Sequence, residues 1–162
     1  MEPKKKPAAF IGGGVGVAIA LLVALSAGSP WVTLHRTDAT AVLPPMWFLS
    51  VLWFGWFFIL GSLCGGLLLS RRRGAYAEAL FWRGMTCLVL SVVCSFVWYV
   101  LFFGKGSLFF SWLCLPLALA AALLTALSWW QTVGKGEACV PLGFALWILC
   151  LFLLQMAVLL HA

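Results

Sequence analysis

Three tryptophans lie far from the ends of the long apolar stretches that contain them: Trp53, Trp98 and Trp147. At 1.5 Å per helical residue, they sit roughly 12, 9 and 14 Å from the nearer end of their stretches. Tryptophans of membrane helices usually gather at the interfaces, as Trp47 does near the start of its stretch. Indoles at greater depth either fill a core or line a pocket in which a flat aromatic ligand can stack.

Polar side chains accompany these indoles at a similar depth. In the third stretch, residues spaced i, i+4, i+7 and i+11 share one helical face: Ser91, Ser95, Trp98 and Phe102. The fifth stretch carries Gln155, whose amide needs a partner in an apolar environment. Together with the indoles these groups form either a ligand pocket or ordinary interhelical packing with one satisfied glutamine, and the two readings stay open.

Enzymatic acid–base or metal chemistry has little support in the sequence. The apolar stretches contain no acidic residue, and the six cysteines form no CxxC pair, which favours a packing role for them. We therefore expect no metal site and no required cofactor. His35 could be an axial haem ligand or a solvated loop residue.

The elements that must position these residues follow from the distribution of charge. The chain has 162 residues, of which 65% are hydrophobic and 9% are charged, a profile far from that of soluble proteins. Apolar stretches long enough to cross a bilayer must be helical, because lipid offers no partners to the backbone. We predict a single all-α integral membrane domain over residues 1–162, a bundle of five transmembrane helices near 8–27, 45–69, 79–103, 107–131 and 138–160.

The net charge of +6 reflects membrane topology and does not indicate nucleic-acid binding, because the basic residues lie at the ends of the stretches. The lipid bilayer is thus the expected partner. With five spans, the N-terminus and the second and fourth loops share one side. That side holds eight of the ten basic residues, namely Lys4, Lys5, Lys6, Arg71, Arg72, Arg73, Arg83 and Lys135. The asymmetry predicts a cytoplasmic N-terminus and an external C-terminus; we favour a retained first helix over a cleaved signal peptide.

The connection over residues 28–44 is long, whereas the other loops are short. It carries Trp31, His35 and Arg36, and it is either a lid above the outer half of the bundle or a solvated surface loop. Arginine pairs well with carboxylates, so Arg36 could bind an acidic ligand beneath such a lid.

Glycine pairs at GxxxG spacing occur in two stretches, Gly12 with Gly16 and Gly61 with Gly65. Such pairs allow helix backbones to approach closely. The contact could lie within the bundle or between the subunits of a homodimer.

Several motifs in order resemble the translocator protein / tryptophan-rich sensory protein (TspO) family. They are Pro44-Pro45-Met46-Trp47 followed by Trp53 and Gly61, the segment from Ser95 to Gly104, Trp129-Trp130-Gln131, and Pro141 with Trp147 and Gln155. The resemblance covers roughly Trp31 to the C-terminus. The chain departs from the family in lacking its Lys-Pro-x-Trp before the double proline and its acidic residue in the fourth helix, and Gln155 replaces an asparagine.

The resemblance implies a receptor- or transporter-like protein of the membrane, here a bacterial cell membrane, that binds a tetrapyrrole such as protoporphyrin IX or haem, or a sterol-like molecule. The expected ligand-binding residues are Trp47, Trp53, Ser95, Trp98, Phe102, Trp147, Gln155, Trp31, His35 and Arg36. An alternative is enzymatic: light-dependent porphyrin degradation through Trp53 and Trp147, which match family positions implicated in it. A third reading is a small membrane scaffold without a ligand.

The first testable prediction concerns orientation. A reporter cysteine placed after His161 should react with a labelling reagent added from outside, because the basic residues hold the N-terminal side in the cytoplasm. If only a reporter at Met1 reacts, the orientation is inverted.

Overall fold

The computed structural model describes residues 5–27, 44–69, 75–105 and 107–161, and regular structure in these ranges is helical throughout. The long helices are α1 (Lys5–Ala27), α3 (Met46–Leu69), α4 (Ala75–Tyr99), α5 (Leu108–Thr132) and α6 (Lys135–His161). A short π-helical segment, η2 (Val100–Gly104), continues α4. All five long helices are long and apolar enough to cross a membrane, which confirms the predicted all-α five-helix membrane bundle. Trp31, His35 and Arg36 lie outside the described residues.

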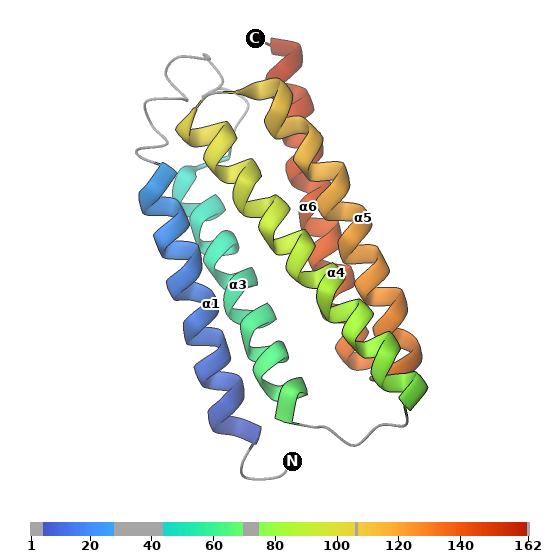
Figure 1. Cartoon of the computed structure of the whole chain (residues 1–162). Coiled ribbons are helices and arrows are strands. Elements are labelled where there is room, and N and C mark those ends of the chain that lie inside the picture. The colour runs from blue at the N-terminus through green and yellow to red at the C-terminus, as the bar shows by residue number, and fades with distance from the viewer. Residues whose placement is uncertain (1–4, 28–43, 70–74, 106, 162) are drawn as a thin grey trace.

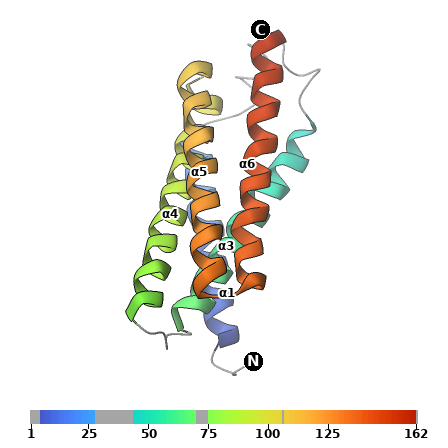
Figure 2. The same cartoon turned by 90° about the vertical axis from the view of Figure 1, so that its right-hand side faces the viewer.

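The helices run alternately up and down, so α1 begins at one end of the bundle and α6 ends at the other (Figure 1). The closest neighbours are α1 with α3, α4 with α5, and α5 with α6. Figure 2 shows the same grouping from the side, with α4, α5 and α6 in front of α1 and α3. The bundle therefore consists of a pair, α1–α3, packed beside a group of three, α4–α5–α6.

Close backbone contact holds the α1–α3 pair together. A Cβ atom added to Gly12 would overlap the carbonyl oxygen of Gly61, and one added to Gly61 would overlap that of Gly12. Gly16 and Gly65 meet the backbone carbonyls of Phe57 and Ala8 in the same way. Both GxxxG pairs are therefore used within the bundle, where they bring the two backbones into direct contact.

The pair meets the group of three through large aromatic side chains. Phe57 of α3 packs on Phe96 of α4 with 4.7 Å between ring centroids, and on Phe144 of α6 with 6.1 Å. Trp56 reaches Phe144 as well, at 5.8 Å. Rings of this size keep α3 further from α4 and α6 than glycine keeps it from α1. An apolar hollow of about 410 Å³ remains between α1, α3 and α4.

The end of α4 departs from regular α-helical hydrogen bonding. The Lys105 N–H donates to the carbonyl of Val100 at 3.1 Å, five residues back, and the Ser107 N–H donates to the carbonyl of Leu101 at 2.9 Å. Such π-helical turns are rare and frequently occur at functional sites. Here the turn carries Phe102 and Phe103, both buried.

The glycine contact gives the second prediction. Gly61→Ala should destabilise the bundle by roughly 1–3 kcal/mol, the usual cost of forcing extra atoms into a packed interface. Gly14→Ala is the matched control, because Gly14 is on the same pair of helices and a Cβ added there meets nothing within 4 Å. Unfolding in detergent with increasing sodium dodecyl sulfate measures both variants. Equal stability of the two variants would contradict the contact.

Candidate ligand cavity

A small cavity lies where α3, the end of α4 and α6 converge. Its volume is about 30 Å³, enough for one or two water molecules. The lining is aromatic and aliphatic with two polar side chains, and comprises Leu49, Ser50, Trp53, Phe54, Trp98, Tyr99, Phe102, Phe103, Trp147, Leu151, Leu154 and Gln155. Among the described residues, the lining contains no charged side chain.

Trp53 forms one wall and is the centre of an aromatic cluster. Its exposed fraction is 4%, and its ring lies 4.9 Å from the rings of Phe57 and Tyr99. The ring of Trp98 is 6.1 Å away in a tilted arrangement. Trp53 and Trp147 both line this cavity.

Gln155 joins three helices through a fully used amide. Its Oε1 accepts a hydrogen bond from the Trp98 Nε1–H at 2.6 Å. Its Nε2 donates to the carbonyl of Leu108 at 2.9 Å and to the hydroxyl of Ser111 at 2.6 Å. This network fixes the rotation of α6 against α4 and α5, and it holds the Trp98 ring parallel to that of Phe102, with 16° between planes.

The other two cavity indoles differ from Trp98 in one respect. Trp53 Nε1 and Trp147 Nε1 are buried and have no hydrogen-bond partner among the described residues. Buried polar groups in proteins are nearly always paired, and a missing partner costs about 1–3 kcal/mol. Two other buried groups, Ser62 Oγ and Trp112 Nε1, also lack such partners, but neither lines the cavity. Two residues of the cavity wall thus each carry a buried N–H donor without a partner among the described residues.

The structure brings together five of the predicted site residues at the cavity, namely Trp53, Trp98, Phe102, Trp147 and Gln155. It places two others elsewhere. The Ser95 hydroxyl donates to the carbonyl of Ser91 at 2.8 Å, on the part of α4 where Ser91 donates to Ala118 of α5 at 2.7 Å. Trp47 has an exposed fraction of 69% and is not part of the lining, which suits the interfacial belt.

The difference within the predicted face of α4 has a simple cause. Trp98 and Phe102 are long enough to reach past the helix to the cavity, whereas the serine hydroxyls are short and bond to nearby helix carbonyls. Side chains on the same face of a helix thus contact different groups, depending on how long each side chain is.

Several lining residues were absent from the predicted set, although helical spacing could have indicated them. Leu151 and Leu154 follow Trp147 at i+4 and i+7, and Leu49 and Ser50 precede Trp53 at i−4 and i−3. Tyr99 is the last residue of α4, whereas Phe103 lies in the π-helical turn, which no sequence signal announces.

A haem axial ligand of nitrogen or sulfur type is not found in the described lining, which contains no histidine, cysteine or methionine. No group of three or more His, Cys, Asp or Glu side chains suited to a metal ion occurs in the described part of the chain.

Comparison of the chain with protein-family models, with curated proteins and with solved structures finds no match.

The Gln155 network gives the third prediction. Gln155→Leu should destabilise the bundle, because it leaves the Trp98 N–H unpaired in the core. Trp98→Phe removes that donor, so the double variant should lose less stability than the two single variants together. We expect a coupling of about 0.5–1.7 kcal/mol, as found for hydrogen bonds between membrane helices. The same detergent unfolding assay measures it, and strict additivity would show that the bond contributes nothing.

Proposed function

We propose that this chain is a TspO-like membrane receptor or transporter that binds a flat hydrophobic ligand at the cavity between α3, α4 and α6. The observation that supports this most is the pair of buried, unpartnered indole N–H groups, Trp53 and Trp147, that line one apolar cavity. A ligand with a flat apolar body and hydrogen-bond acceptors would stack on these rings and satisfy both donors.

The number of donors favours a tetrapyrrole over a sterol. A sterol carries a single hydroxyl at one end and can satisfy one indole at most. Protoporphyrin IX carries two carboxylates and ring nitrogens, so one molecule offers acceptors at several positions. The aromatic lining, with Trp98 and Phe102 stacked at 5.5 Å, is likewise suited to a planar conjugated ligand.

The cavity must widen to admit such a molecule, because its present volume is about 30 Å³. The bundle offers a route for this change. The α1–α3 pair and the α4–α5–α6 group each have close internal contacts, whereas α3 meets α4 and α6 through aromatic rings. A ligand that enters between the groups replaces ring–ring contacts with ring–ligand contacts, so separation of the groups is offset by new stacking.

A second candidate is light-dependent porphyrin degradation. Trp53 lies within an unbroken series of rings, 4.9 Å from Tyr99 and 6.1 Å from Trp98, and indoles and phenols are readily oxidised. In this activity a photoexcited porphyrin would take an electron from an indole and pass it to dioxygen, which forms superoxide. The indole radical cation would regain an electron from the porphyrin, and the resulting porphyrin radical cation would combine with superoxide to give the oxygenated product. If the protein binds no such ligand, the remaining hypothesis is a membrane scaffold without a ligand.

The fourth prediction separates these functions. Trp53→Phe and Trp147→Phe should retain most protoporphyrin IX binding, with roughly fivefold weaker affinity from the lost N–H donor, and should abolish any photodegradation. Trp53→Ala and Trp147→Ala should lose both, since stacking is worth roughly 1 kcal/mol or more. Titration of the porphyrin absorbance band measures binding, and the same band followed under illumination measures degradation.

Trp112→Phe is the matched control, because it removes a buried unpartnered indole that does not line the cavity. Its binding should equal that of the wild type. If all Trp→Phe variants bind as the wild type does, the unpartnered donors do not recognise the ligand. If the Phe variants still degrade porphyrin in light, the binding role survives and the catalytic role does not. If the wild type does not bind porphyrin, the proposed ligand class is wrong.

A further inference from the structure

A second apolar hollow lies at the opposite end of the bundle, where α5 ends and α6 begins. It is a groove of about 440 Å³, within the roughly 300–1,000 Å³ of small-molecule sites. Two small buried residues, Ala126 and Ala138, form its floor. Leu123, Leu127 and Leu142 form its sides, with exposed fractions of 41%, 63% and 46%. The groove therefore opens outward onto the lipid-facing surface of the bundle.

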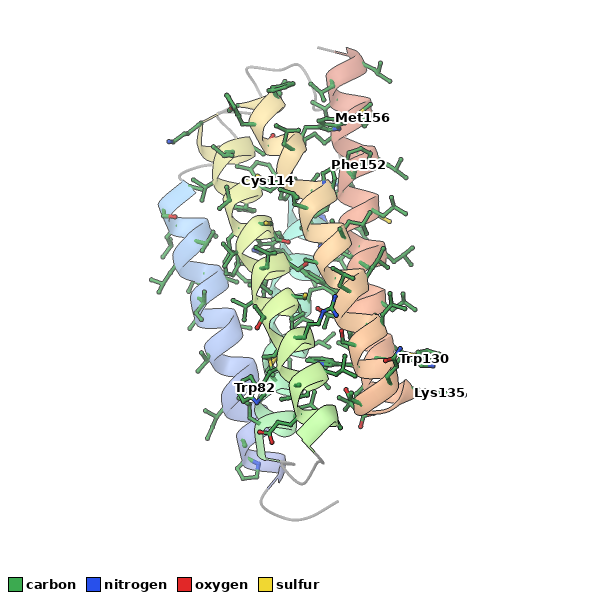
Figure 3. All side chains as sticks on the ribbon, turned by 45° about the vertical axis from the view of Figure 1, so that its right-hand side comes forward. Trp82, Cys114, Trp130, Lys135, Phe152 and Met156 are labelled. Atoms are coloured by element: carbon green, nitrogen blue, oxygen red, sulfur yellow. The ribbon has the colours of Figure 1, made fainter. Side chains whose placement is uncertain are left out.

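Trp130 and Lys135 stand at the end of this groove. Trp130 belongs to its lining, and the Lys135 Nζ lies 5.7 Å from the centroid of the Trp130 ring. Figure 3 shows both side chains together at the edge of the bundle, near the same end as Trp82. Gly134, with φ of +151°, forms the turn that brings the start of α6 back beside the end of α5. A cation is thus held at the mouth of an apolar groove.

We propose that this groove binds an anionic phospholipid, with an acyl chain along the leucine and alanine lining and the phosphate beside Lys135. Tryptophan and lysine at the ends of membrane helices lie at the level of the headgroups. The groove runs from that level toward the hydrocarbon, as a lipid does. Lys135 contacts an indole, and none of the described carboxylates forms an ion pair with it, so its charge is available to a phosphate.

The charge of this end of the chain also favours an anionic lipid. Eight of the ten basic residues belong to the same side by topology, the side predicted to be cytoplasmic. The cytoplasmic leaflet is the negatively charged one, and basic residues near its surface attract anionic headgroups. Glu137 lies in the same turn, with its carboxylate against Gly134, and this acid would favour a zwitterionic lipid instead. The experiment therefore compares an anionic with a zwitterionic lipid headgroup.

The experiment uses the purified full chain and lipids with brominated acyl chains, which quench nearby tryptophan fluorescence. The quenching of Trp130 is obtained as the difference between the quenching of the wild type and that of Trp130→Phe. Phosphatidylglycerol should quench this part at concentrations about fivefold lower than phosphatidylcholine with the same chains. Lys135→Gln should remove that preference, because one basic residue near an anionic surface contributes about this much affinity.

Two matched controls come from the chain itself. Lys105 lies in a Gly-Lys-Gly sequence like that of Lys135 but at the other end of the bundle, so Lys105→Gln should keep the preference. Leu127→Phe should fill part of the groove and weaken binding of both lipids without adding a fluorescent indole. Leu117→Phe should not, since Leu117 is equally exposed on α5, at 62%, but does not line the groove. Helix content by circular dichroism verifies that each variant is folded.

Four results would overturn the proposal. The first is equal quenching by the two lipids in the wild type. The second is a loss of preference in Lys105→Gln as large as in Lys135→Gln, which would show general charge attraction. The third is displacement of the lipid by glycerol phosphate at similar concentration, which would show a site for free phosphate. The fourth is unchanged lipid binding in Leu127→Phe, whether or not that variant changes the oligomeric state.

Discussion

Lipid tails are as apolar as leucine, so helices inside a bilayer gain little by burying leucine against one another. What holds them together is close packing of surfaces and the few hydrogen bonds that polar side chains can make. The described part of this chain has examples of each. Glycines bring α1 and α3 into backbone contact, and Gln155 connects α4, α5 and α6 through Trp98, Leu108 and Ser111. Hydrogen bonds from Ser91 to the carbonyl of Ala118 and from Thr125 to that of Gly84 also join α4 to α5.

The same constraint explains where the bundle can change shape. At backbone contacts such as that between Gly12 and Gly61, the helices cannot rearrange by side-chain rotation, because no side chain lies between them. Aromatic contacts such as that between Phe57 and Phe96 are different, since a ring can rotate and exchange one flat neighbour for another. The cavity lies on this second kind of boundary. A ligand that is itself flat and aromatic can therefore enter at the boundary without breaking the contacts that hold each group together.

The sequence was sufficient to predict where the helices lie along the chain, but not how each helix is rotated about its axis. Charge-free stretches located all five spans, because an uninterrupted apolar run of that length has only one stable form in lipid. Depth along a helix could also be counted, which placed Trp53, Trp98 and Gln155 at one level. Which neighbour each side chain meets depends on the rotation of its helix and on the length of the side chain. For that reason Ser95 was expected at the cavity and instead bonds to Ser91, and the pairing of Gln155 with Trp98 was not foreseen. The π-helical turn at Val100–Gly104 added a further rotation that periodic spacing cannot anticipate.

The three cavity indoles fall into two groups, one with a hydrogen bond from its N–H and two without, and the groups differ in the contribution that they can make to ligand binding. Trp98 is bonded to Gln155 and stacked on Phe102, so its ring belongs to the framework and any movement of it must break that bond. Trp53 and Trp147 have no such bond among the described residues. Rotation of either ring would therefore cost no hydrogen bond. In the function that we propose, a ligand with acceptors would satisfy both donors, and the free-energy cost of leaving them unpaired would be removed on binding. The two donors would then favour flat molecules that carry acceptors over hydrocarbons of the same shape.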